Sequence, residues 1–191
     1  MSAVIIVVLF VGVVVALLVV GYVVSIYNSL VSLRRRVDQS KQNIDVLLTQ
    51  RQEELTKLID TVSEFMDHEE GLLTELTRAR EQAEQASSPN EEAAADEAIK
   101  NVMFELDART EDYPELRSNT NVEQLQSRIS DIENQIADRR EHYNEATTRY
   151  NTRIEQFPYV IFARQFGFQS KELFEASAEQ KADVDVGEAF A

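Results

Sequence analysis

One unbroken apolar run near the N-terminus constrains this chain more than any other feature. Residues Ala3 to Val24 read AVIIVVLFVGVVVALLVVGYVV and carry no charged side chain. About 20 apolar residues are enough for an α-helix to span the ~30 Å hydrocarbon core of a bilayer. The many valines favour a strand in water, but a lone strand in lipid would leave its backbone groups unpaired. The run therefore predicts a transmembrane helix.

A cleaved signal peptide is the competing interpretation of this run. Signal peptides normally have a basic start, a shorter apolar stretch and a small-residue cleavage site. Here no Lys or Arg precedes the run, which is longer than usual. Tyr22 and Tyr27 lie near its end, where aromatic rings prefer the membrane interface. We therefore expect residues 1–29 to be an uncleaved, single-pass anchor that contacts membrane lipid.

The orientation of the anchor follows from its flanking charges. Arg34, Arg35 and Arg36 come shortly after the run, whereas only Met1 and Ser2 precede it. The positive-inside rule then predicts that the N-terminus faces outward from the cell membrane and that the following domain lies in the cytoplasm.

The rest of the chain is strongly acidic, with a net charge of -15. This charge argues against nucleic acid as a partner, because an acidic surface repels phosphate. Lysine is rare and most of the positive charge is arginine, which favours a halophilic chain adapted to high salt over an ordinary acidic protein. Cysteine is absent, so thiolate chemistry and disulfides are excluded, while the compartment stays open.

Seven-residue apolar repeats predict long helices after the anchor. The stretch from Tyr27 to Ala86 has no proline and reads as one helix, whose repeat is interrupted at Arg51. A turn at residues 87–90 and a weaker helix from Glu91 to Asp112 follow. The repeat positions of the first helix are Leu30, Val37, Ile44, Leu58, Phe65, Leu72 and Ala79.

A third helix has the most regular pattern. Tyr113-Pro114 ends the preceding helix, and Asn121 is expected to be the N-cap, with Gln124 as its capping-box partner. Pro158 should stop the helix. Its repeat positions are Val122, Ile129, Ile136, Tyr143, Tyr150 and Phe157.

Helices with apolar stripes must bury them against one another, which predicts an all-α fold. We expect an elongated antiparallel bundle of three long helices, or four if the first is broken near Thr56. Its expected range is residues 30–176, followed by an acidic disordered tail over 177–191. A coiled-coil dimer is the alternative, because the same stripes can pair between chains.

Catalytic, cofactor-binding and metal-ligating patterns are missing from the sequence. Di-iron bundles need Glu-x-x-His motifs, but Phe65 and Arg139 stand three residues before His68 and His142. The spacings of Glu64 with His68 and of His142 with Glu145 are typical of solvated or locally paired residues. No phosphate loop or nucleophile motif occurs, so we expect no enzyme and no cofactor.

Tyrosines and asparagines stand out in the third helix. Tyr143 and Tyr150 occupy core positions, which predicts buried rings with satisfied hydroxyl groups. Asn144 and Asn151 are also seven residues apart. We expect them to fix helix register by hydrogen bonding, with a ligand site as the alternative.

The chain resembles LemA family proteins along nearly its whole length. The similar stretches include YNSLVSLRRRVDQS from Tyr27, YPELRSN from Tyr113 and FGFQSKELFEA from Phe166. The family commonly has Trp and Pro near positions where Gln42 and Thr56 stand here. The resemblance implies a membrane-tethered helical bundle, commonly of four helices, and supplies no catalytic residue.

Two functional hypotheses follow from these patterns. The first is a non-enzymatic scaffold that binds other membrane proteins or itself. The second is a sensor that takes a small ligand or cation on its acidic surface. The aromatic segment from Tyr159 to Phe174 is expected to cap the bundle end, which would make Phe166 a core residue; an interfacial membrane contact is the alternative.

Overall fold

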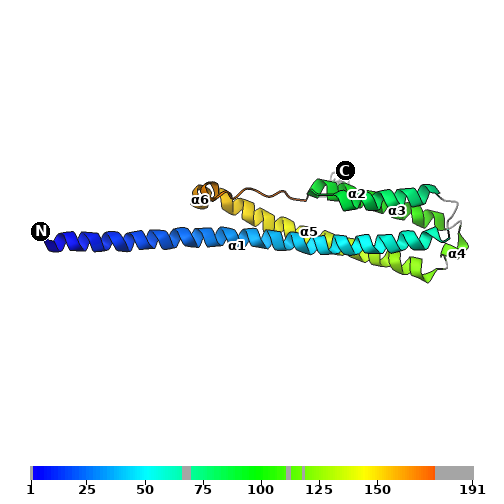
Figure 1. Cartoon of the computed structure of the whole chain (residues 1–191), viewed down its shortest axis with the longest axis horizontal. Coiled ribbons are helices and arrows are strands. Elements are labelled where there is room, and N and C mark those ends of the chain that lie inside the picture. Colours follow the sequence, from blue (N-terminus) through cyan, green and yellow to red (C-terminus); the bar gives the residue numbers. More distant parts are fainter. Residues whose placement is uncertain (1, 66–69, 111–112, 118, 175–191) are drawn as a thin grey trace, which may run out of the picture. The chain divides into compact units, whose positions relative to one another are not determined.

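The computed structural model describes residues 2–65, 70–110, 113–117 and 119–174, and every regular element in these ranges is a helix (Figure 1). The all-α fold is therefore confirmed. The helices are α1 (Ser2–Ser63), α2 (Glu70–Gln85), α3 (Pro89–Thr110), α4 (Pro114–Arg117), α5 (Thr120–Glu155) and α6 (Tyr159–Phe166).

The described residues divide into two compact units, and α1 and α5 contribute to both. Unit 1 contains α1 up to Lys41, α5 from Tyr143, and the following chain as far as Lys171. Unit 2 contains the remainder of α1, all of α2, α3 and α4, α5 up to His142, and the residues from Glu172 onward.

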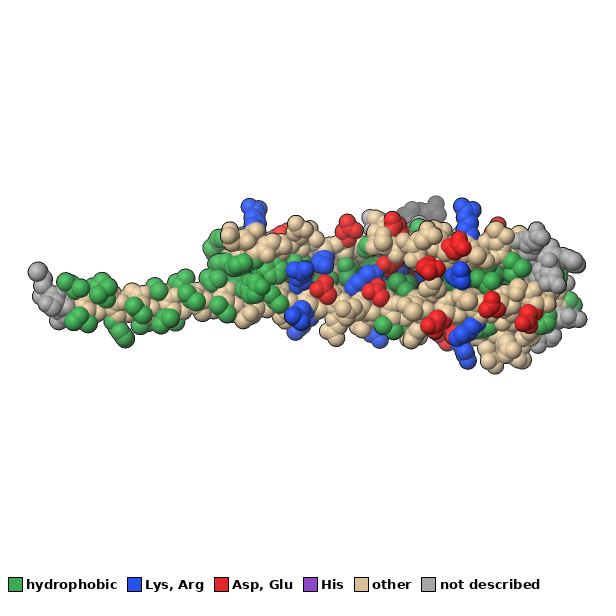
Figure 2. Space-filling model, in the orientation of Figure 1, with side chains coloured by type: hydrophobic (Ala, Val, Ile, Leu, Met, Phe, Trp, Pro, Cys, Tyr) green, Lys and Arg blue, Asp and Glu red, His purple; other side chains and the backbone are tan. Residues whose placement is uncertain are grey.

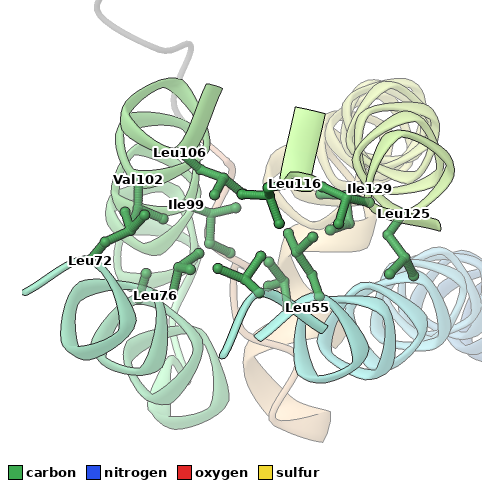
Figure 3. Packing of buried hydrophobic residues seen from close by; sticks show 13 residues of the cluster. Leu55, Leu72, Leu76, Ile99, Val102, Leu106, Leu116, Leu125 and Ile129 are labelled. Atoms are coloured by element: carbon green, nitrogen blue, oxygen red, sulfur yellow. The ribbon is translucent and has the colours of Figure 1, made fainter. Parts of the chain in front are cut away.

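The core of unit 2 is a helical bundle closed by apolar side chains from five helices. Figure 3 shows Leu55 of α1, Leu72 and Leu76 of α2 and Ile99 of α3 directed toward one another. Leu116 of α4 joins the same core, so this short helix closes the connection between α3 and α5. Further members of the core are Leu58, Val62, Ala79, Val102, Leu106, Val122, Leu125 and Ile129.

Unit 1 buries two further apolar stripes, one on α1 before Lys41 and one on the C-terminal part of α5. Ile26, Leu30 and Val37 of α1 are buried, as are Tyr150 and Ile154 of α5. The seven-residue repeats thus correctly identify the buried faces of both long helices up to Tyr150. The last repeat residue, Phe157, is 81% exposed, because α5 ends at Glu155.

The first helix is shorter than its pattern suggests. The expected continuous helix from Tyr27 to Ala86 is wrong, because α1 ends at Ser63 and a new helix begins at Glu70. The helix runs unbroken through Thr56, so the break lies beyond the position considered from the sequence. Folding back lets α1 and α2 bury their stripes in one core, and this tertiary gain outweighs local helix propensity.

Two helix starts differ from the sequence expectation. Asn119, and not Asn121, caps α5: its side-chain oxygen accepts from the Asn121 backbone N–H at 2.9 Å. At α3, the Ser88 hydroxyl accepts from the Glu91 N–H, and the Glu91 carboxylate accepts from the Ser88 N–H at 3.1 Å. This reciprocal pair is a capping box that the sequence reading did not identify. Its hydrogen bonds, those from Ser87 first, lower the pKa of Glu91.

Candidate functional site

A buried ion-pair network in unit 2 is the most unusual polar feature of the described residues. It begins at Arg51, the residue that interrupts the apolar repeat of α1. The Arg51 side chain is only 3% exposed, and its Nη1 lies 2.7 Å from Oδ1 of Asp96 on α3. The interruption is therefore a charged residue at a core position, and a carboxylate compensates its charge.

The network continues from Asp96 to α5. The second carboxylate oxygen of Asp96 accepts a hydrogen bond from Nη1 of Arg140, and Nη2 of Arg140 lies 3.7 Å from Oε2 of Glu92. The Arg140 guanidinium also lies over the Phe174 ring, 4.7 Å from its centroid. Asp96 thus joins two arginines from two different helices, and α1, α3 and α5 are linked at one level.

Glu133 adds a third carboxylate beside these groups. Burial raises the pKa of Glu133, although the positive charges of Arg51 and Lys100 oppose the shift. A raised pKa means that the folded chain disfavours the charged form of this side chain. The network therefore contains one carboxylate whose ionisation costs stability.

A small cavity lies against the same network. It has a volume of about 190 Å³, and its walls include Arg51, Arg80, Glu84 and Glu92. The lining combines both signs of charge with apolar side chains such as Leu55. Such a cavity could admit a small polar molecule, but its walls do not form a nucleophile–base pair.

His142 belongs to no metal-binding arrangement among the described residues. No group of three His, Cys, Asp or Glu residues that could hold a metal ion occurs among residues that the structure describes. His142 is exposed, and Glu145 accepts a hydrogen bond from Arg149 at 2.6 Å. His68 lies outside the described residues, so its expected solvated role is not tested.

The tyrosine and asparagine pattern of α5 fixes the chain that follows α6. The Tyr150 hydroxyl donates to the backbone oxygen of Gln169 at 2.9 Å, which confirms a buried ring with a satisfied hydroxyl. Burial raises the pKa of Tyr150. The Asn151 amide donates to the Lys171 oxygen and accepts from the Lys171 N–H, each at 2.9 Å. The expectation that Asn151 fixes register between helices is wrong, because its partner is the backbone of Lys171, which lies outside the helices.

The aromatic segment is less buried than the capping hypothesis requires. Phe174 is buried, but Phe166 is 47% exposed and Ile161 is 56% exposed. The Phe166 ring packs edge-on against Tyr27 of α1, with ring centroids 5.2 Å apart. Phe166 is therefore not a core residue, and Phe166→Ala should cost less than the about 2–4 kcal/mol that truncation of a large core side chain costs, because nearly half of its surface is already in contact with solvent.

Sequence reasoning found the members of this network only in part. Arg51 carried a signal, because a charge on an apolar stripe must find a partner when it is buried. Glu92, Asp96, Glu133 and Arg140 carried none, since each looks like an ordinary residue of an acidic helix surface. Their alignment depends on how three helices meet.

Comparisons with known proteins identify the relatives of this chain. A family model described as LemA family matches residues 40–187. Protein LemA of Metamycoplasma hominis is 24% identical over 165 residues, which cover 84% of this chain and 74% of the relative.

Magnetosome proteins are also similar over a shorter segment. Magnetosome protein MamQ 2 of Paramagnetospirillum magneticum is 33% identical over 81 residues, covering 42% of this chain and 30% of the relative. Magnetosome protein MamQ of Magnetospirillum gryphiswaldense is 31% identical over 80 residues, covering 42% and 29%. The chain thus matches less than a third of the length of these MamQ proteins.

Proposed function

This chain belongs to the LemA family, and on that basis we propose that it is a membrane-anchored, non-enzymatic interaction protein. One observation carries the proposal: α1 is both the apolar helix that fits a membrane anchor and a helix of the bundle. Val4 to Val24 are largely exposed, yet Ile26 and Leu30 are buried within the same helix. A fold whose buried part begins on the same helix as its anchor is suited to presenting side chains at a membrane surface.

The charged groups of unit 2 support a binding role over a catalytic one. Arg51 and Arg140 both pair with Asp96, so these largely buried charges hold helices together. Catalytic groups, in contrast, need an unsatisfied or shifted residue that faces a substrate cleft. Glu133 has the shifted pKa, but its shift arises from burial inside the bundle.

The proposed orientation places the bundle in the cytoplasm. Arg34 to Arg36 are exposed on α1, and positive charge beside a membrane helix is retained on the cytoplasmic side. Protease added to intact spheroplasts should leave the bundle uncut, whereas lysed spheroplasts should lose it. Digestion in intact spheroplasts would reverse the assigned orientation.

The proposed partners are other membrane proteins or a second copy of the chain. Crosslinking in intact membranes, followed by mass spectrometry, should recover crosslinks from the bundle to a small set of membrane proteins or to itself. A matched sample solubilised in detergent before crosslinking controls for random collisions. Crosslinks that are equally abundant in both samples and spread over unrelated proteins would contradict a specific interaction role.

The second candidate function is a sensor of a small charged ligand. The cavity of about 190 Å³ beside Arg51 and Glu92 favours it, because both signs of charge line its wall. A thermal-shift series with divalent cations and small metabolic anions, at constant ionic strength, tests this role. A saturable rise in melting temperature that Arg80→Ala abolishes would favour the sensor, since a ligand that binds only the folded chain stabilises it.

A further inference from the structure

Helix α6 exposes apolar side chains that the bundle does not use. Phe157, just before the helix, is 81% exposed, Ile161 is 56% exposed and Phe166 is 47% exposed. Figure 2 shows apolar side chains gathered at the α6 end of unit 1, next to the apolar part of α1. Large apolar groups that remain exposed together indicate a contact with something outside the fold.

The position of α6 along α1 places this surface at the edge of the apolar run. Val24 is 51% exposed, but Ile26 is 2% exposed, so the fold begins to cover α1 immediately after the run ends. Tyr27 lies three residues beyond Val24, which is about 4.5 Å along a helix. The Phe166 and Phe168 rings lie 5.2 and 6.0 Å from the Tyr27 ring, measured between centroids. The headgroup layer on each side of a bilayer is about 5–8 Å thick, so α6 is at its level.

Specific contacts hold α6 at this level within unit 1. Arg153 of α5 lies over the Tyr159 ring at the start of α6, 4.8 Å from its centroid. At the other end Gly167 has a positive φ of 70°, which glycine adopts without strain, and the Phe168 N–H closes the helix on the Ala163 oxygen. The chain beyond is fixed at Lys171 by Asn151. The C-terminal end of α6, with the half-exposed Phe166, is therefore held beside Tyr27.

The charge around α6 and the start of α1 suits a lipid surface better than the acidic charge of the rest of the chain. Residues 1–37 and 156–171 contain none of the 34 acidic residues of the chain. Their charged side chains are all basic: Arg34, Arg35, Arg36, Arg164 and Lys171. A carboxylate in the headgroup layer would be repelled by anionic lipid and would lose hydration. The two stretches without carboxylates are those that meet where α1 leaves the apolar run.

We propose that α6 is a second membrane contact, an interfacial helix that lies in the headgroup layer of the bilayer that α1 crosses. Phe157, Ile161 and Phe166 enter the boundary between headgroups and acyl chains, and Arg164 remains among the phosphates. Tethering by α1 explains how so short a helix could bind, because the anchor already holds it at the surface. A free interfacial helix of eight residues would bury too little apolar area to remain bound.

The absence of tryptophan from the chain provides a direct test. The full-length variants Phe166→Trp and Ile161→Trp are each reconstituted into liposomes that contain anionic lipid, with or without bromine on the acyl chains. Bromine quenches tryptophan fluorescence on contact. Phe104→Trp is the matched control, because Phe104 is an aromatic residue of α3 that is 79% exposed. Unchanged far-UV circular dichroism checks the fold of each variant.

The proposal predicts a blue-shifted emission from Trp at 161 and 166 that brominated lipid quenches, and an unquenched, water-like emission from Trp at 104. Bromine near the glycerol backbone should quench more than bromine near the chain ends. Emission from 161 and 166 that bromine does not quench would overturn the proposal. An unquenched blue shift that grows with the protein-to-lipid ratio would assign the surface to a second copy of the chain instead.

Discussion

Asp96 pairs with both Arg51 and Arg140. Asp96→Ala should therefore be among the most destabilising single substitutions in unit 2. The change removes the carboxylate that faces Arg51, whose side chain is 3% exposed. Breaking a buried ion pair on one side costs about 3–5 kcal/mol, because the remaining charge stays buried without compensation. Glu92 still lies 3.7 Å from Arg140, which favours the lower end, or about 3 kcal/mol.

Urea unfolding of the full-length chain in detergent micelles, followed by far-UV circular dichroism, measures this loss. With a typical slope of about 2 kcal/mol per molar urea, the midpoint should fall by about 1.5 M. Glu145→Ala is the matched control, because it removes the ion pair of Glu145 with Arg149, whose side chains are 59% and 66% exposed. The N–O distance is 2.6 Å in this exposed pair and 2.7 Å in the buried pair of Arg51 with Asp96. Its expected cost is about 0.3–0.5 kcal/mol.

Comparing Asp96→Ala with Glu145→Ala separates the effect of burying an ion pair from the effect of forming one. Both introduce alanine into a helix, so helix propensity favours both and cannot cause the predicted loss. Arg51→Leu is an intermediate case, because Asp96 still pairs with Arg140 and leucine fits the apolar repeat of α1. The loss of unfolding free energy in Arg51→Leu should be well below that in Asp96→Ala. If Asp96→Ala shifts the midpoint no more than Glu145→Ala does, the network contributes no more than a surface pair and the reasoning is refuted.

Three further predictions concern groups in both units. Glu133→Gln should raise the urea midpoint at neutral pH, because a carboxyl pKa that burial raises makes the charged form costly above that pKa. The gain should disappear as the pH falls through the raised folded pKa toward the ordinary glutamate value, and a gain that persists there would contradict a titration origin. Asn151→Ala should speed amide hydrogen exchange at Lys171, with Asn134→Ala on the exposed face of α5 as control, because two hydrogen bonds worth about 1 kcal/mol each are lost. The melting temperature should rise from low to molar KCl, since salt screens repulsion among the carboxylates of a chain with a net charge of -15; a flat or falling curve would argue against salt adaptation.

The sequence predicted the elements of the bundle better than it predicted their connections. The apolar repeats of α1 and α5 correctly identify Leu30, Ile44, Ile129 and Tyr150 as buried, because burial on a helix follows its period directly. The break after Ser63 left no proline or glycine signal at the helix end. It follows from the shared core of α1 and α2, which is a tertiary effect.

The polar features depended even more on tertiary structure. Asn151 was singled out correctly as an unusual polar residue, but its partner is the backbone of Lys171, twenty positions away. Phe166 shows the opposite error: its hydrophobic character suggested the core, whereas it packs on Tyr27 and remains half exposed. Hydrophobicity alone cannot distinguish burial in a protein core from contact with lipid.

Within unit 1, α1 passes directly from its exposed apolar run into its buried part, and this continuity determines which insertions the helix can accept. Ile26 is buried only two residues beyond Val24, so no flexible spacer separates the two parts of the helix. Adding one residue there would turn the preceding helix by about 100° and shift it by about 1.5 Å relative to the buried face. The rotational phase of the apolar run is thus coupled to that of the α1 face that is buried within unit 1. Insertions of a whole number of turns should be tolerated far better than insertions of one or two residues.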